Sequence, residues 1–296
     1  MSAGAAQSGT ILVLGASGGV GQCLTRQLQD AGYNVLGSAL NDADLEGMKA
    51  NGLDAVDLFV ADFSSADVGA SQLVKALERS DRPLYAVISC VGVNPSGPLE
   101  TTPIETFRRT MEINTISNLA IYQATLPHIR KNKGRFIFVG SMSGKIAFPL
   151  LGYYTASKFA LEGLADTMRL EAGQWGVPVS LIEPGAISTA MVHGFGAQLD
   201  RGLVQLDEEG RQNYGHYFEQ QKAFSQSADK VAVAPDVVAA TIIEALEAPV
   251  PASRYAIGNA VELLELRRIS SDVEIDALFN QMLPGNRSVL QSTDPI

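Results

Sequence analysis

Three side chains between Ser141 and Lys158 bring together a hydroxyl, a phenol and an ammonium group. Tyr154 and Lys158 are four residues apart, and the apolar spacing over 154–174 predicts a helix, so both side chains leave one face of its first turns. Ser141 follows the apolar run 135–139, which is typical of a buried strand. Open α/β sheets bind ligands at the carboxyl ends of strands, so the three groups could exchange a proton with an alcohol or ketone there. Taken alone, the Tyr–Lys spacing is better explained by two unrelated surface residues on a helix.

A glycine-rich turn near the amino terminus favours a nucleotide site. The run Thr10–Leu14 predicts a first buried strand, Gly15–Gly21 reads Gly-Ala-Ser-Gly-Gly-Val-Gly, and 22–30 predicts a helix. Glycines let the backbone approach a pyrophosphate, and a helix amino terminus offers it unpaired N–H groups. A flexible turn without a ligand is the alternative. The position directly after the first strand favours the cofactor site.

The end of the predicted second strand, 34–39, bears on the choice of dinucleotide. An acid here favours NAD and a base favours NADP, and Leu40-Asn41 supplies neither. Asp42 is better explained as a helix N-cap. Gly18 stands where a basic residue often supports a 2′-phosphate. The lack of a cation favours NAD slightly.

Two further segments contribute polar groups near the expected site. Asp62 follows the predicted third strand, 55–60, where it could accept from the adenine amino group or cap the next helix. A fourth strand over 85–89 leads into Cys90-Val-Gly92, a turn that would lie over the cofactor. Asn114 lies inside the helical stretch 104–131, where local hydrogen bonding is the ordinary explanation of an Asn. It could instead bond Lys158 through water.

The segment after the sixth strand is expected to border the substrate. That strand is predicted over 177–182 and ends in Glu183-Pro-Gly185, leaving Ile187 and Thr189 to meet a ligand. The stretch 190–230 is irregular and amphipathic, which predicts a lid over a binding cleft. The alternative is a surface excursion packed on the sheet. A helix over 235–246 and a last strand over 254–257 complete the pattern.

Composition excludes several classes of protein. The 296 residues carry a net charge of -10 with 46% hydrophobic residues, so neither disorder nor nucleic-acid binding is expected. No apolar run is long enough to span a membrane, and the opening residues lack the features of a secretory signal. We therefore expect a cytoplasmic protein with two reduced cysteines, no metal site and one domain over 1–296. The ends, 1–9 and about 285–296, are expected to be disordered.

Together these residues resemble the short-chain dehydrogenase/reductase family, in its compact single-domain branch, over nearly all of 10–249. The resemblance implies an α/β fold of Rossmann type: a doubly wound parallel sheet with helices on both faces and a small lid insert after the sixth strand. It also implies NAD or NADP as cofactor. A homodimer or homotetramer would form through the two long helices that begin near Ile104 and Tyr154.

The resemblance assigns site residues one by one. Asn114, Ser141, Tyr154 and Lys158 match the family's catalytic four. The implied cofactor contacts, besides Tyr154 and Lys158, are Gly15, Ser17, Gly18, Gly19, Val20, Gly21, Leu40, Asp62, Phe63, Cys90, Val91, Gly92, Pro184, Gly185, Ile187 and Thr189.

Two departures from the family pattern affect the contacts that support the carboxyl ends of the strands. Ser89-Cys90-Val91-Gly92 replaces the usual Asn-Asn-Ala-Gly, and Leu14 stands where a threonine usually precedes the glycine turn. The run 38–40 and the stretch 154–163 are similar to the branch that acts on retinol and hydroxysteroids.

The implied mechanism makes Tyr154 the acid or base. Lys158 and oxidised nicotinamide would lower the pKa of Tyr154, Ser141 would hold the substrate oxygen, and Asn114 would pass protons to solvent. Apolar residues at Phe148, Leu150 and Leu151, with the aromatics of 190–230, predict a bulky lipophilic alcohol or ketone such as a sterol, retinoid or aryl alcohol. A non-catalytic dinucleotide-binding regulator, or an epimerase or dehydratase with a tightly held cofactor, is the alternative.

Overall fold

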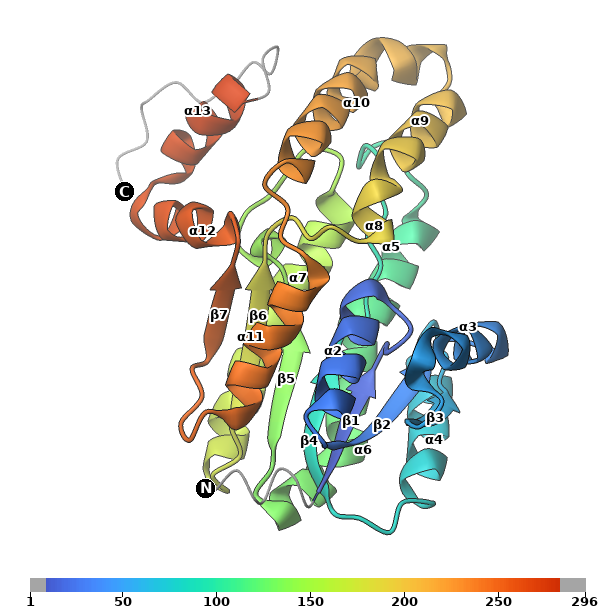
Figure 1. Ribbon diagram of the computed structural model, residues 1–296. Helices are drawn as coiled ribbons and strands as arrows, with labels where there is room; N and C mark the ends of the chain where they lie inside the picture. The colour runs from blue at the N-terminus through green and yellow to red at the C-terminus, as the bar shows by residue number, and fades with distance from the viewer. Residues whose placement is uncertain (1–8, 283–296) are drawn as a thin grey trace.

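Seven parallel strands form a central sheet in the order β3-β2-β1-β4-β5-β6-β7 (Figure 1). The computed structural model describes residues 9–282, so the predicted tails, apart from Gly9, lie outside the described residues. The strands are β1 Thr10–Leu14, β2 Asn34–Ala39, β3 Asp57–Val60, β4 Leu84–Ser89, β5 Arg135–Val139, β6 Val179–Pro184 and β7 Arg254–Ile257. The winding reverses between β3 and β4, so the carboxyl ends of β1 and β4 flank the point where such sheets bind ligands.

Helices cover both faces of the sheet, which confirms the predicted fold class. Alternate residues of β1 point to opposite faces: Ile11 and Val13 join one hydrophobic core, and Leu12 and Leu14 join the other. The first core lies under α2 (Gly19–Asp30) and α11 (Pro235–Glu247). The second lies under α4 (Ala66–Leu77), α6 (Ser117–Asn132) and α7 (Gly152–Gly173).

The helical stretch predicted over 104–131 is not continuous. It consists of α5 (Ile104–Met111), a wide π-helical turn at Glu112–Ile116 and then α6. Asn114 lies in that wide turn and is fully buried. Periodicity cannot show such a break, because a single wide turn leaves the apolar spacing on either side intact.

Two local predictions are corrected. Asn41 rather than Asp42 caps α3 (Asp42–Met48), because its side-chain oxygen accepts the N–H of Asp44 at 2.8 Å. The apolar spacing that predicts a helix over 154–174 includes Phe159 and Leu170 on its apolar side, but these side chains are 45% and 72% exposed on α7. The chain leaves α3 through a turn at Lys49–Leu53 that contains Gly52 with φ 83°.

The stretch expected to be irregular after β6 is helical. It forms α8 (Ala190–His193), α9 (Phe195–Gln205) and α10 (Glu208–Asp229), and α9 and α10 extend side by side beyond the carboxyl ends of the strands (Figure 1). The apolar sides of these helices pack against each other and against Leu150. The buried residues of this cluster, besides Leu150, are Phe195, Leu199, Leu206 and Phe218. Polar residues interrupt the helical periodicity here, which is why the pattern predicted an irregular segment.

Two more helices follow β7, where the sequence pattern predicted none. They are α12 (Ala260–Ile269) and α13 (Asp272–Met282). The Phe279 ring packs edge-on against Phe148, with centroids 5.1 Å apart, so α13 supports the segment that leads to the start of α7. None of the helices within 9–282 is long and apolar enough to cross a membrane.

Candidate active site

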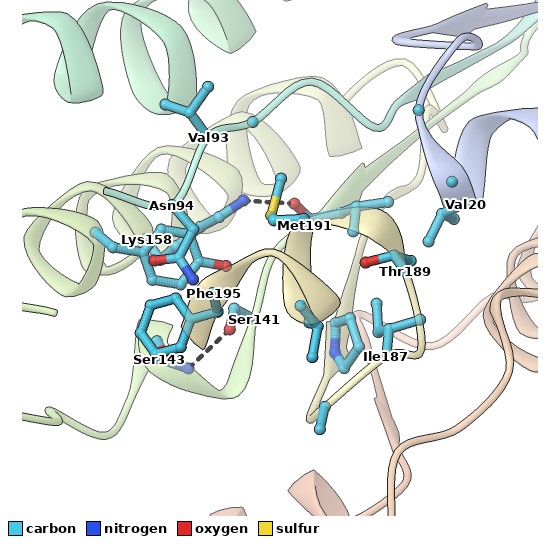
Figure 2. Close-up of a pocket in the computed structure, with 18 of the residues that line it drawn as sticks. Val20, Val93, Asn94, Ser141, Ser143, Lys158, Ile187, Thr189, Met191 and Phe195 are labelled. Atoms are coloured by element: carbon cyan, nitrogen blue, oxygen red, sulfur yellow. Dashed lines mark hydrogen bonds between the residues drawn. The ribbon is translucent and has the colours of Figure 1, made fainter. Parts of the chain in front are cut away.

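A cavity of about 460 Å³ lies at the carboxyl ends of the strands. Its lining combines the glycine turn after β1, the segment after β4, the segment after β5, the start of α7 and the turn after β6. Figure 2 shows Ser141 and Ser143 on one side of this pocket and Ile187, Thr189 and Met191 on the segment that follows β6. Residues from these five parts of the chain, and from α10, therefore meet at the sheet's switch point.

The glycine turn fits a dinucleotide phosphate. Gly15 has φ 71°, which side-chain-bearing residues rarely adopt. A Cβ at Gly21 would overlap the carbonyl oxygen of Gly15 and lie 2.8 Å from Cα of Ala16, so this helix start packs against the turn with no room for a side chain. No side chain caps α2 at Gly18, and its first turn carries no acid. The unpaired backbone N–H groups at the start of α2 can therefore bind an anion.

Ser38 braces this turn, and the sequence analysis missed its role. Its buried hydroxyl accepts the N–H of Gly15 at 3.0 Å, and its backbone carbonyl accepts the N–H of Ala16 at 2.8 Å. The apolar side chain of Leu14, which stands where the family usually has a threonine, cannot hydrogen-bond to the turn. Ser38 supplies a hydrogen bond to the turn instead. The signal that was available is a serine near the end of an otherwise apolar strand.

Ser141, Tyr154 and Lys158 all line the cavity, so the structure brings the three predicted groups together. The Tyr154 hydroxyl is hydrogen-bonded to Ser141, whose oxygen also accepts the N–H of Ser143 at 3.1 Å. Lys158 is buried, and its Nζ lies 5.7 Å from the centroid of the Tyr154 ring. Nζ donates to the carbonyl oxygen of Val139 at 2.9 Å, which fixes it above the end of β5.

Burial has a larger effect on the pKa values of Tyr154 and Lys158 than the charges and hydrogen bonds around them. It raises the pKa of Tyr154, and the hydrogen bond with Ser141 offsets only part of that rise. It lowers the pKa of Lys158 to about 8. The expectation that Lys158 lowers the pKa of Tyr154 is therefore wrong for the protein alone. At neutral pH Tyr154 is a protonated phenol that can donate to a carbonyl oxygen.

Asn114 lies behind the lining and does not itself border the cavity. Its Oδ1 accepts the N–H of Val93 at 2.8 Å, and its Nδ2 donates to the Val93 carbonyl and to Ser157 Oγ, both at 2.9 Å. These bonds use both amide hydrogens and clamp the segment after Gly92 onto α7. A water-mediated role toward Lys158 stays a prediction.

The predicted cofactor contacts divide into two groups. Three lie outside the cavity lining: Leu40, Asp62 and Phe63. Leu40 is half-exposed at the end of β2, and Phe63 is buried in the core against Gly69. The Asp62 carboxylate accepts the N–H of Ser64 at 2.8 Å in a local turn, whereas Ser65 is the N-cap residue of α4, so the alternative role of Asp62 as the cap of that helix is wrong. The other contacts line the cavity: Gly15, Ser17, Gly18, Gly19, Val20, Gly21, Cys90, Val91, Gly92, Tyr154, Lys158, Pro184, Gly185, Ile187 and Thr189.

The far wall of the cavity is apolar. Phe148 and Leu151 come from the segment before α7, as predicted from the sequence, whereas Leu150 turns away to pack on α9. The helices after β6 add Met191, Phe195 and Phe224. Within the described residues, no group of three or more His, Cys, Asp or Glu side chains could hold a metal ion.

This fold and pocket define a dinucleotide-dependent α/β oxidoreductase. The family model for short chain dehydrogenases matches residues 9–200. The chain belongs to the short-chain dehydrogenase/reductase family and is an NAD(P)-dependent oxidoreductase.

Known proteins extend this match along most of the chain. A 3-amino-tetrahydro-pyrrolizinone reductase of Xenorhabdus hominickii is 30% identical over 93% of this chain and 96% of its own. The 17-beta-hydroxysteroid dehydrogenase type 1 of Mus musculus is 31% identical over 88% of this chain and 76% of its own. A crystal structure of a short chain dehydrogenase from Burkholderia cenocepacia, in complex with NADP, superposes with a TM-score of 0.68 at 22% identity, over 94% of this chain and 98% of the other.

Proposed function

We propose that this enzyme transfers hydride between a nicotinamide cofactor and a bulky, lipophilic alcohol or ketone. The observation that carries the proposal is one continuous cavity, in which the glycine turn and Tyr154 face a wall of aromatic and aliphatic side chains. Burying an apolar ligand against that wall contributes roughly 25 cal/mol per Å² of surface removed from water. A sterol, retinoid or aryl alcohol has both the size and the apolar surface for such a site.

Tyr154 is the proton donor or acceptor in this proposal. Its raised pKa keeps the phenol protonated at neutral pH, which suits reduction of a carbonyl. Ser141, hydrogen-bonded to Tyr154, would hold the same substrate oxygen as charge develops on it. Lys158 would bind the cofactor ribose and keep a positive charge near the phenol below its pKa of about 8. The bound cofactor supplies the hydride acceptor or donor.

NAD is the cofactor that the charges near β2 favour. The first turn of α3 carries Asp42 and Asp44, and the Asn41 side-chain oxygen is engaged in capping that helix. Two carboxylates close to the end of β2 would repel a 2′-phosphate. The Burkholderia cenocepacia relative was solved with NADP, so the two cofactors need direct comparison.

The proposal also covers the domain organisation, the cellular location and the oligomeric state of the enzyme. The chain would act as one cytoplasmic domain, with 190–230 as the lid of the substrate site. Exposed apolar side chains on α7, Phe159 and Leu170, support a homodimer or homotetramer formed through α7 and the α5–α6 stretch.

Replacement of Tyr154 by Phe tests the proposal. With NAD, NADP and a panel of lipophilic secondary alcohols and ketones, we expect Tyr154→Phe to lower kcat by about 10²–10⁴ while cofactor binding persists. The matched control is Tyr153→Phe, because the Tyr153 hydroxyl donates to the Thr102 carbonyl at 2.8 Å and Tyr153 does not line the cavity.

Each contrary result has a distinct meaning. Equal turnover by wild type and Tyr154→Phe would remove Tyr154 from the mechanism. Preference for small polar polyols would refute the lipophilic substrate class. Cofactor binding without turnover of any alcohol or ketone would favour a regulator, and a cofactor that survives purification would favour an epimerase or dehydratase.

A further inference from the structure

Two glutamates meet beneath the active site, outside the cavity lining. Glu162 lies on α7 one turn after Lys158, and Glu183 lies on β6 directly before Pro184. Their side chains are 6% and 5% exposed. The two carboxyl groups meet at Arg254, whose guanidinium lies 2.7 Å from Glu162 Oε2 and 3.6 Å from Glu183 Oε1.

The cations around this pair bind only one of its four oxygens closely. Lys145 Nζ lies 2.8 Å from Glu162 Oε2, and Arg254 on β7 donates to the same oxygen at 2.7 and 3.0 Å. Arg254 lies 3.6 Å from Glu183 Oε1, beyond hydrogen-bond reach. Within residues 9–282 the Oε1 atoms of both glutamates are buried and receive no N–H or O–H from another residue.

Among the described residues, the other charged groups nearby do not donate a hydrogen bond to either Oε1 atom. Asp166, one turn further along α7, binds Arg254 at 3.0 Å and Arg169 at 3.0 Å on the more exposed side of the cluster. Lys158, one turn before Glu162, directs its ammonium to the Val139 carbonyl. A proton between the two glutamates is the donor that would satisfy both buried oxygens.

We propose that Glu162 and Glu183 share one proton, and that the protonated pair is a positioning unit that fixes the turn after β6 relative to α7. Two carboxylates that are buried around the same guanidinium repel each other, which favours the protonated form of one of them. Burial and the contact with Glu162 raise the pKa of Glu183 to about 8, in agreement with this geometry.

The pair joins three segments that build the active site. Gly144, three residues after Ser141, leaves no space for a side chain, since a Cβ there would lie 2.9 Å from Glu162 Cγ. Glu162 therefore supports the serine segment from below, and Glu183 leads into Pro184 and Gly185 in the cavity lining. Loss of the shared proton above about pH 8 would set two carboxylates against each other and push the turn after β6 away from α7.

Thermal unfolding across pH tests the shared proton without any activity assay. A pKa raised from 4.5 to about 8 means that the folded protein holds this proton more tightly than the unfolded chain. Its stabilising effect is then complete below pH 4.5 and is lost as the pH rises to about 8. We expect the Tm of wild type, relative to Glu183→Gln, to fall by several degrees between pH 5 and 8. The control Asp166→Asn, which removes a carboxylate that shares no proton, should keep the wild-type fall.

Two further measurements separate the outcomes. Infrared spectra of wild type should show a protonated-carboxyl band at pH 7 that disappears above about pH 8 and is missing from Glu183→Gln. Fluorescence titration with NADH and NADPH should show affinity that weakens above pH 8 more steeply in wild type than in Glu183→Gln. Parallel Tm curves, or no such band in wild type, would overturn the shared proton, and parallel affinity profiles would overturn the positioning role. Failure of the proposed substrate class would alter none of these readouts.

Discussion

Replacement of Ser38 by Ala isolates the brace under the glycine turn. The Ser38 hydroxyl is buried and accepts the N–H of Gly15 at 3.0 Å, while backbone bonds of β2 stay in place. Ser38→Ala leaves the half-buried N–H of Gly15 without its acceptor, and an orphaned donor costs about 1–3 kcal/mol. Urea unfolding monitored by circular dichroism should show a loss of free energy of unfolding in that range. Because Gly15 begins the phosphate turn, dinucleotide affinity should fall by about tenfold for each 1.4 kcal/mol transmitted to the site.

Ser89→Ala is the matched control for this effect. Ser89 ends β4 next to β1, pairs in register with Leu14 and is as buried as Ser38. Within the described residues its hydroxyl has no hydrogen-bond partner, so its removal leaves no orphaned donor. We expect a change near zero in stability and in dinucleotide affinity. Equal losses in the two variants would show that packing, and not the bond to Gly15, explains the role of Ser38.

Two further substitutions address the glycine turn and the buried lysine. Gly21→Ala places a methyl group against the Gly15 carbonyl and should abolish dinucleotide binding in a fluorescence titration, with about 1–3 kcal/mol lost from the free energy of unfolding. Its control, Gly163→Ala in an open position of α7, should stabilise by about 0.4–1 kcal/mol. Burial lowers the pKa of Lys158 from 10.5 to about 8, so the unfolded chain binds more protons between those values. The free energy of unfolding of wild type should therefore rise relative to Lys158→Met by about 3 kcal/mol from pH 8 to 10.5, and a constant difference would contradict the buried, weakened ammonium.

The sequence predicts the sheet well because its strands are short, apolar and buried on both faces. Five residues at Thr10–Leu14 and six at Asn34–Ala39 have the predicted bounds, and β7 agrees as well. The third and sixth strands begin two residues later than predicted, at Asp57 and Val179. Apolar residues already precede both strands, at 55–56 and 177–178, so hydrophobicity does not mark where pairing starts.

The helices after β6 and the carboxyl-terminal helices were harder to predict, because their apolar residues pack on partners far away in the sequence. Phe279 contacts Phe148, and Phe218 joins Leu150 and Leu199 in one cluster. Helices stabilised in this way depend on tertiary packing more than on local periodicity. Much of the cavity lining could be predicted because it follows strand ends in a fixed order, whereas the bond between Ser38 and Gly15 depends on how β2 lies beside β1.

The break between α5 and α6 shows how a neighbouring helix sets the position of Lys158. Asn114 and Thr115, both in the wide turn, bind the side chain and the backbone carbonyl of Ser157 at 2.9 Å. Ser157 also donates to the Tyr154 carbonyl at 2.6 Å, so the turn that carries the phenol and the ammonium is held from the side opposite the cavity. A regular α-helix over 112–116 would rotate these donors away, because each helical residue turns by about 100°. The polar residues that interrupt the long helix therefore position the first turns of α7, and Asn114 also holds Val93 of the cavity lining, so substitutions there act on the site from behind the lining.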